Sequence, residues 1–276
     1  MSMSSNVYGI VGLPVVAIRQ DAGERYEMVT QLLFGEIYEV LGNKDGWLHI
    51  RNQWDGYEGY LSESQYISLS SVPTKAPIVS GEPIAQLIWE DGLCSWLPLG
   101  AHLPEFDIHT GRGSFNGKTY QWLGKVYDTA TKLSALEAWQ AAWNYWNSPY
   151  LWGGKHPLGI DCSGFTQQIW KLAGHPLLRD AYQQATQGLR IDTLEASQTA
   201  DLAFFARPSD GRIIHVGIVC NPEDLPQGWQ ARMPTASRYI LHAFDAVRLD
   251  VLDEHGIWNI VQKRHTHQTS HWQRFW

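Results

Sequence analysis

The sequence predicts an α+β protein in which two small all-β barrels precede a larger domain of helices followed by an antiparallel sheet. Three observations lead to this prediction. Short β-prone runs alternate with turn signals from residue 7 to residue 128, helical periodicity begins only after Asp128, and strand-like runs return from Leu202 onward. The 14 Trp, 12 Tyr and 25 Gly also favour short strands and tight turns over long helices.

Composition restricts the class of protein. The chain has 276 residues, of which 44% are hydrophobic and 18% charged, so it is expected to fold throughout into about two or three domains. The formal net charge of -7, without a basic run, argues against nucleic acid or another polyanion as ligand and suits a cationic or zwitterionic partner. The cysteines Cys94, Cys162 and Cys220 are too few for a disulfide scaffold and indicate a reducing compartment.

The N-terminal residues bear on localisation. Residues 1–5 lack the positive region of a signal peptide, and glycines and a proline interrupt the apolar stretch 7–18. No uncharged apolar run approaches the roughly 18 residues that span a bilayer. We therefore expect a cytoplasmic protein without a membrane partner.

The first predicted barrel covers residues 6–70. Short β-prone runs within it are separated by turn residues at 43–46 and 54–56. Together with the spacing of Gly35-Glu36 and of the aromatic and glycine residues at 57–60, this pattern resembles the bacterial SH3-like domain.

A linker containing Pro, Ser and Thr is expected at residues 71–80. Weaker strand and turn signals then predict a second SH3-like domain at residues 81–128, although no sharp repeat period is present. Residues 129–276 form the largest predicted domain.

Two helices are predicted at the start of this domain. Ser134 and Glu137 form a capping box, and apolar residues then recur at helical spacing as far as Pro149. A second helix is expected from residue 162 to residue 173, with Asp161 as N-cap. Strand-like runs follow at residues 202–205, 213–220 and 239–244.

The densest cluster of chemically informative residues surrounds Cys162. Its expected position in the first turn of a helix brings the thiol close to free N–H groups and to the positive end of the helix dipole, which stabilise a thiolate nucleophile. The small Ser163 and Gly164 leave room for a substrate carbonyl, so Ser163 is a candidate substrate-binding residue, and the Cys162 amide can donate to an oxyanion. Cys94 and Cys220 are interpreted as small apolar residues instead.

A cysteine nucleophile needs a base, and two histidines in strand-like runs are the candidates. His215 lies in the run 213–220, which would hold its ring rigidly across from the helix. His242 lies in the next run, where antiparallel pairing could bring it to the far nitrogen of His215 and so orient that ring. The predicted catalytic set is Cys162, His215 and His242. The alternative for either histidine is an ordinary core or surface residue.

Four blocks in this order, at residues 151–154, 161–165, 215–218 and 241–243, resemble the NlpC-type family of papain-like cysteine peptidases over roughly the C-terminal half of the chain. With SH3-like domains in front, the chain is similar to γ-D-glutamyl-L-diamino acid endopeptidases. The resemblance implies a papain-like fold, no cofactor or metal, and hydrolysis of peptidoglycan-derived peptides such as L-Ala-γ-D-Glu-diaminopimelate. It also implies a free N-terminal L-Ala on the substrate and a role in cell-wall recycling.

The resemblance further implies roles for individual residues. Tyr150 would help hold the oxyanion, Trp152 would line the cleft, and Asp180 would bind the ammonium group of the substrate. In related enzymes the first SH3-like domain supplies a glutamate and a tyrosine to the same ammonium group. By motif position these correspond to Glu36 and Tyr57.

Several features leave alternatives open. Ala181 stands where relatives often have serine, and the stretch 221–238 looks longer than usual and could be a surface loop or a lid. Asp180 could simply cap a short helix near residues 182–185. The histidines of the tail at 265–271 could suggest zinc, but no cysteine or acidic residue lies nearby in the sequence.

The leading interpretation is therefore a cysteine endopeptidase that acts on cell-wall peptides. The alternatives are an amidase or acyltransferase on the same scaffold, and a non-catalytic wall-binding module whose aromatic barrels hold the ligand. The intact pair of Cys162 and His215 favours an enzyme.

Overall fold

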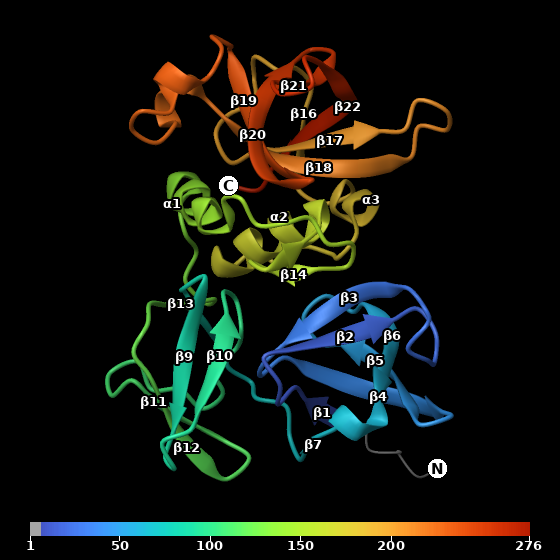
Figure 1. Ribbon diagram of the computed structural model, residues 1–276, viewed down its shortest axis with the longest axis vertical. Coiled ribbons are helices and arrows are strands. Elements are labelled where there is room, and N and C mark those ends of the chain that lie inside the picture. The colour runs from blue at the N-terminus through green and yellow to red at the C-terminus, as the bar shows by residue number, and fades with distance from the viewer. Residues whose placement is uncertain (1–6) are drawn as a thin grey trace. The chain divides into compact units, whose positions relative to one another are not determined.

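The computed structural model describes residues 7–276, and these form two compact units (Figure 1). The first unit contains the chain up to Thr131 together with Trp152–Pro157, and the second contains Lys132–Leu151 and Leu158–Trp276. The predicted start of the first domain at residue 6 lies outside the described residues. The segment Trp152–Pro157, which the sequence assigned to the C-terminal domain, thus belongs to the first unit.

The first predicted barrel is confirmed as an antiparallel sheet of seven strands in the order β3-β2-β6-β5-β4-β1-β7. Val16, Ile18 and Ile50 lie on its buried face and pack in one core. A two-residue turn joins β4 to β5, where Asp45 and Gly46 have φ angles of 53° and 79°. The strands are β1 (Val7–Ile10), β2 (Val15–Arg19), β3 (Met28–Leu33), β4 (Ile37–Lys44), β5 (Trp47–Asn52), β6 (Glu58–Ser62) and β7 (Ser68–Leu69), with the 3-10 turn η1 (Glu63–Gln65).

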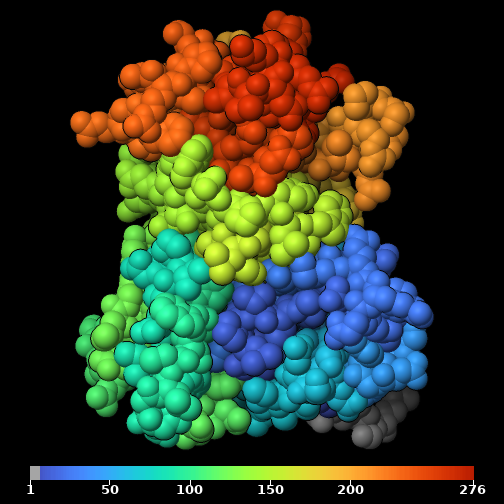
Figure 2. Space-filling view, in the orientation of Figure 1, coloured from blue at the N-terminus to red at the C-terminus, as the bar shows by residue number. Residues whose placement is uncertain are grey.

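The second group of strands forms two smaller antiparallel sheets, β10-β9-β12-β11 and β13-β8. The end of the predicted linker 71–80 is strand β8, which pairs with β13. This group shares a hydrophobic core with the first barrel, where Phe34 packs against Phe115 and Trp89, and Figure 2 shows the teal atoms of this group touching the blue atoms of the barrel. The two predicted barrels therefore form one unit. The strands are β8 (Ile78–Ser80), β9 (Ile84–Trp89), β10 (Cys94–Pro98), β11 (Arg112–Phe115), β12 (Lys118–Trp122) and β13 (Val126–Asp128), and β14 (Lys155–His156) lies in the added segment.

Both predicted helices of the second unit are confirmed. The Ser134 hydroxyl and the Glu137 carboxylate make the capping box of α1, and Asp161 caps α2. The helices are α1 (Ala135–Ala142), α2 (Cys162–Leu172) and the single turn α3 (Ala181–Gln184), with the 3-10 turn η2 (Trp143–Tyr145) after α1.

A seven-stranded antiparallel sheet in the order β16-β22-β17-β18-β19-β20-β21 completes the second unit, and additional pairing of β21 with β22 closes it. Helix α2 packs on β18 and β19, the two strands that carry His215 and His242 (Figure 1). The elements are β15 (Gly159–Ile160), β16 (Leu189–Ile191), β17 (Leu202–Ala206), β18 (Ile213–Cys220), β19 (Arg238–Phe244), β20 (Ala246–Asp253), β21 (Gly256–Asn259) and β22 (Arg264–Arg274), with the turns η3 (Pro222–Asp224) and η4 (Gln230–Arg232).

One segment differs from what the sequence suggested. Residues 265–271 are not a tail but part of β22, because pairing with β17 and β21 builds this stretch into the closed sheet. The long stretch 221–238, for which a surface loop and a lid were both open, lies largely at the surface, and its Trp229 ring contacts Trp143 of η2 and Trp146. These aromatic contacts fix the stretch as an ordered part of the second unit.

The segment that the first unit takes from the C-terminal half of the chain is held by buried polar contacts. The Lys155 N–H donates to Gln31 Oε1 at 2.9 Å, and the buried Lys155 ammonium pairs with the buried Glu36 carboxylate at 3.5 Å. Gly153, with a φ of 76°, passes so close to Met28 that a Cβ would lie 2.4 Å from the Met28 carbonyl oxygen. A side chain therefore does not fit at this position.

Glu36→Gln is predicted to destabilise the first unit. The substitution leaves the buried Lys155 charge without its carboxylate, which typically costs about 3–5 kcal/mol. Chemical denaturation followed by tryptophan fluorescence measures the loss. Glu58→Gln removes an exposed partner of Arg51 and serves as the matched control, with no expected change in the transition. A Glu36→Gln protein as stable as the wild type would contradict the anchoring role of this ion pair.

Candidate active site

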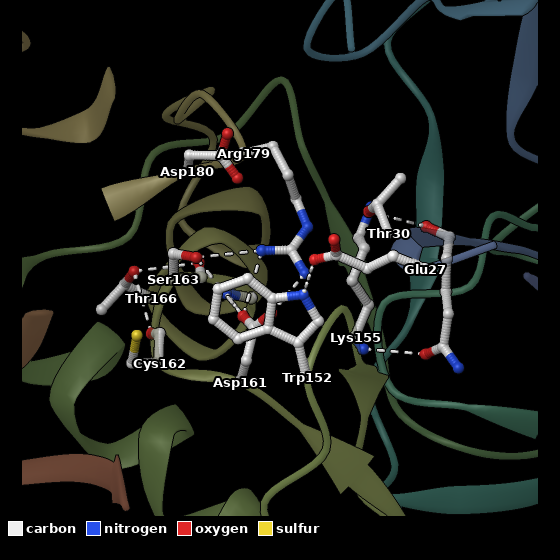
Figure 3. Close-up of polar contacts among 12 residues, drawn as sticks. Glu27, Thr30, Trp152, Lys155, Asp161, Cys162, Ser163, Thr166, Arg179 and Asp180 are labelled. Carbon is white, nitrogen blue, oxygen red and sulfur yellow. Dashed lines mark hydrogen bonds and ion pairs between the residues drawn. The ribbon is translucent and has the colours of Figure 1, made fainter. Parts of the chain in front are cut away.

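Asp161 fixes the start of α2 and thereby places Cys162 in its first turn. Asp161 Oδ1 accepts a hydrogen bond from the Gly164 N–H at 2.6 Å. The buried Arg179 guanidinium holds the same carboxylate through two contacts of 3.0 and 2.7 Å, as Figure 3 shows. This ion pair determines where the helix begins and therefore where the thiol lies.

Ser163 takes part in the same network. Its hydroxyl accepts a hydrogen bond from Arg179 Nη1 at 2.9 Å and donates to Asp161 Oδ1 at 3.3 Å (Figure 3). The residue is buried. These contacts give Ser163 a structural role at the helix start, and its contribution to substrate binding stays a prediction.

The Cys162 sulfur lies where the start of α2 meets β18. The Ser163 and Val216 amides both donate hydrogen bonds to it. Burial first and the Asp161 charge second nevertheless raise the pKa of the thiol to about 12. The resting site therefore favours a neutral thiol, in contrast to the thiolate expected from the helix position alone.

His215 and His242 meet as the predicted strand pairing suggested. His215 Nε2 lies 2.8 Å from His242 Nδ1, and His215 directly precedes Val216, the residue whose N–H reaches the sulfur. Burial lowers the pKa of His215 well below its ordinary value, and His267 and His242 lower it further. Burial also lowers the pKa of His242, although Asp250 opposes this shift. A neutral imidazole next to a neutral thiol is suited to general-base catalysis.

Asp250 and His267 extend this cluster, and sequence reasoning missed both. Asp250 Oδ2 lies 3.1 Å from His242 Nε2. The His267 ring stacks on His215, with 4.2 Å between ring centroids and 24° between planes. Asp250 lies between the apolar Leu249 and Val251 in β20, and a carboxylate at such a position is the signal that could have identified it.

Tyr150 lies just before α2, in a short backbone bridge with Ile160. Burial raises the pKa of its phenol, and the interaction with Cys162 that arises when the thiol ionises adds to the shift, so the phenol is within electrostatic reach of the sulfur. The hydroxyl therefore stays protonated and able to donate a hydrogen bond. These properties support the predicted role of Tyr150 at an oxyanion.

Asp180 is the N-cap of α3, which is the alternative that the sequence left open. Its N–H donates to Gln183 Oε1 at 3.0 Å, and its carboxylate bonds with the Tyr182 side chain. The residue is only half-buried. Capping and substrate binding are compatible, so the ammonium-binding role stays a prediction.

Trp152, Glu36 and Tyr57 belong to the first unit. The Trp152 ring is well exposed, and its Nε1 donates to Glu27 at 2.5 Å (Figure 3). The Glu36 carboxylate accepts a hydrogen bond from the Leu33 N–H at 3.0 Å in addition to its lysine partner, which favours a structural role. Tyr57 is half-buried between β5 and β6. The substrate contacts expected of these three residues remain predictions.

Within residues 7–276, no three histidine, cysteine or acidic side chains are grouped so that they could hold a metal ion. His265 of the histidine-rich stretch instead pairs with Asp253 at 2.8 Å. Over the same residues, the helices lack the combination of length and apolar character that crossing a membrane requires.

The fold and the site define a papain-like cysteine peptidase, in which a thiol at a helix start packs against a sheet that carries its base. The chain belongs to the NlpC/P60 family, whose model matches residues 147–269. Residues 18–65 match the bacterial dipeptidyl-peptidase SH3 domain. The family and the enzyme class expected from the sequence are thereby confirmed.

Curated relatives cover both units. The chain is 30% identical over 205 residues to the γ-D-glutamyl-L-lysine dipeptidyl-peptidase of Bacillus subtilis, covering 68% of each chain. It is 31% identical over 206 residues to dipeptidyl-peptidase 6 of Lysinibacillus sphaericus, covering 65% of this chain and 74% of the relative. A crystal structure of an NlpC/P60 family protein from Bacillus cereus matches with a TM-score of 0.74 at 19% identity, covering 97% of this chain and 99% of the other. That structural match shows the shared fold.

Buried histidines are predicted to make folding stability depend on pH. In the folded protein the pKa values of His215, His242 and His267 lie below the ordinary 6.5, because burial disfavours the charged ring. The unfolded chain therefore binds more protons below about pH 6.5, so this stability is full above that pH and is lost as the pH falls. Each such histidine contributes at most about 1.4 kcal/mol per pH unit, and only at pH values between its folded and unfolded pKa.

Urea unfolding at several pH values measures this slope. His267→Phe keeps an aromatic ring but removes one titrating group, so it should reduce the slope. A free energy of unfolding that stays constant from about pH 7.5 to 5 would show that these rings are not held neutral.

Proposed function

We propose that the protein hydrolyses the γ-D-glutamyl–diamino acid bond of peptidoglycan-derived peptides that carry a free N-terminal L-Ala, such as L-Ala-γ-D-Glu-diaminopimelate. The observation that carries this proposal is the hydrogen bond from the Val216 N–H of β18 to the Cys162 sulfur, which places the thiol next to His215. The choice of bond is supported by a relative named γ-D-glutamyl-L-lysine dipeptidyl-peptidase and by the SH3-domain match at residues 18–65.

Acylation moves one proton and forms one bond. Neutral His215 takes the thiol proton while Cys162 Sγ attacks the γ-D-Glu carbonyl carbon, whose oxygen becomes an oxyanion. The Tyr150 hydroxyl and the Cys162 N–H donate hydrogen bonds to that oxygen. The C–N bond then breaks, the leaving amine takes the proton from His215, and L-Ala-γ-D-Glu remains as a thioester on Cys162.

Deacylation repeats these steps with water as the nucleophile. His215 takes a proton from the water as its oxygen attacks the thioester carbonyl, and the proton returns to the Cys162 sulfur when the dipeptide leaves. Because burial keeps the resting thiol and imidazole neutral, charge develops only as bonds form. The oxyanion donors therefore act mainly on the transition state, which is where they increase the rate.

Recognition of a free amine would restrict the enzyme to released fragments, because the amine of L-Ala is blocked in intact wall. The half-buried Asp180 carboxylate and the net charge of -7 suit an ammonium group. We therefore assign the enzyme to recycling of turnover peptides in the cytoplasm, an assignment supported by its few, unpaired cysteines.

Cys162→Ala is predicted to abolish release of diaminopimelate from L-Ala-γ-D-Glu-diaminopimelate, because no thioester can form. Mass spectrometry of the reaction mixture follows both products, and circular dichroism checks the fold. Cys94→Ala, at an exposed cysteine, is the matched control and should keep full activity.

The other outcomes decide between function classes. Near-normal turnover by Cys162→Ala would contradict the nucleophile assignment. Transfer of the dipeptide to an added amine in preference to water would indicate an acyltransferase. Binding of the peptide without turnover by the wild type would indicate a wall-binding module.

Acetylating the N-terminus of the substrate is predicted to lower kcat/KM by about ten- to a hundredfold, through loss of a charged hydrogen bond to Asp180. Asp180→Asn should remove most of this discrimination, whereas Asp192→Asn, at an exposed carboxylate of the same unit, should not. Equal rates on free and acetylated peptides with the wild-type enzyme would contradict the ammonium-binding role.

A further inference from the structure

A continuous hydrogen-bond chain runs from Asp250 to the catalytic base. Asp250 Oδ2 lies 3.1 Å from His242 Nε2, and His242 Nδ1 lies 2.8 Å from His215 Nε2. Asp250 and His242 are fully buried, and His215 is 4% exposed. Because water has so little access, these groups must satisfy one another within the protein.

The carboxylate dictates where each proton in this chain lies. An ionised carboxylate only accepts hydrogen bonds, so His242 carries its proton on Nε2. Its Nδ1 then has a free lone pair and accepts a hydrogen bond from the Nε2–H of His215. His215 in turn keeps its lone pair on Nδ1, which is the nitrogen left to take the proton of Cys162.

The contacts of Asp250 keep it ionised. Arg248 Nε and Nη2 donate to its two oxygens at 2.8 and 3.1 Å, and the Ile260 N–H donates to Oδ1 at 3.0 Å. Asn259 Oδ1 accepts a further hydrogen bond from Arg248 Nη2 at 3.1 Å and so holds the guanidinium in place. Burial acts to raise the pKa of the Asp250 carboxyl, but the hydrogen bonds from His242, Ile260 and Arg248 outweigh it and the pKa lies below its usual value.

Other titratable groups also face the two imidazoles. The His267 ring stacks on His215, the Cys162 thiol meets β18 beside His215, and the charge of Asp245 acts on His242. Burial lowers the pKa of His267 to about 3, so this neighbour is neutral. Among the described residues, Asp250 is the group that hydrogen-bonds to the outer nitrogen of His242.

We propose that Asp250 is a positioning residue of this peptidase, which fixes the tautomers of His242 and His215 so that the base presents an unprotonated Nδ1 to Cys162. Asp250 acts through the two histidines and does not touch the reacting atoms. The Cys162 proton moves to His215 Nδ1 and later to the leaving amine, while Asp250 keeps its charge throughout. The proposal rests on the Cys–His chemistry of the family and not on the identity of the substrate.

Asp250→Asn tests the proposal because it changes hydrogen-bond direction with little change in shape. The asparagine amide can take two orientations. With its NH2 group at the Oδ1 position, that group would face two donors, Arg248 Nη2 and the Ile260 N–H. With its NH2 group at the Oδ2 position, it faces only Arg248 Nε and can donate to His242 Nε2, so this orientation is favoured. His242 would then carry its proton on Nδ1 and donate to His215 Nε2. The proton of His215 would move to Nδ1, the nitrogen that must be free.

The expected result is a fall in kcat of about 10²–10⁴-fold with KM nearly unchanged. Asp253→Asn makes the same chemical change in an exposed Asp–His pair on the same strand and is the matched control. Its kcat should stay within about twofold of the wild type. An Asp250→Asn enzyme that folds and keeps its kcat would overturn the proposal.

His242→Asn separates positioning from simple destabilisation. The Oδ1 of asparagine can occupy the place of His242 Nδ1 and accepts from His215 Nε2 without a second partner. Adding Asp250→Asn to His242→Asn should therefore cost far less in kcat than it costs in the wild type. An equal cost in both backgrounds would show that Asp250 acts only on the fold.

The native protein provides a test that needs no folded Asp250 variant. Nitrogen-15 NMR of histidine-labelled enzyme at neutral pH should show His215 and His242 as Nε2–H tautomers, with resonances assigned from their absence in His215→Ala and His242→Ala. A proton on Nδ1 of either ring in the resting enzyme would contradict the proposal directly.

Discussion

The hydrogen bond from the Val216 amide to the Cys162 sulfur is the contact on which the active site depends. It joins the start of α2 to β18, two elements that are distant in sequence, and His215 directly precedes the donor. The Asp161–Arg179 ion pair sets the beginning of the helix, and sheet pairing sets the position of the strand. The thiol and its base are therefore placed by backbone and buried ion-pair geometry rather than by flexible side chains, which favours a preorganised site.

Burial then decides the charge state of the site. A helix start with free N–H groups lowers the pKa of a thiol, but the cost of placing a charge away from water is larger here, and Asp161 adds to it. The same cost keeps His215 neutral. The chemistry follows from these charge states. A neutral thiol must give its proton to the neutral His215 imidazole as the sulfur attacks. That transfer is possible only if the nitrogen of His215 that faces the thiol carries no proton.

Local signals in the sequence predict much of the fold and of the site. The capping box of Ser134 and Glu137, the N-cap Asp161 and the apolar periodicity locate the helices, and strand-like runs locate His215 and His242. The strands β20 and β22 escape such reasoning because polar residues interrupt them, and only sheet closure buries Asp250 and brings His267 onto His215. The placement of these two residues beside His242 and His215 therefore becomes visible only in three dimensions.

The membership of Trp152–Pro157 in the first unit could not be predicted for a similar reason. It depends on the buried pairing of Lys155 with Glu36 and on the close approach of Gly153 to Met28, both of which join positions far apart in the chain. The family resemblance implies Glu36 as a ligand for the substrate ammonium group, and its contacts with Lys155 and Leu33 favour a structural role, so the substrate contact stays a prediction. The position of a carboxylate in a sequence motif does not reveal whether a buried lysine already pairs with it.

The covalent intermediate provides the most direct test of the account. Acid quenching of the wild-type enzyme during turnover of L-Ala-γ-D-Glu-diaminopimelate, followed by peptide mapping with mass spectrometry, identifies the residue that carries the acyl group. The account predicts L-Ala-γ-D-Glu attached as a thioester to the peptide that contains Cys162. An acyl group on any other residue would contradict it.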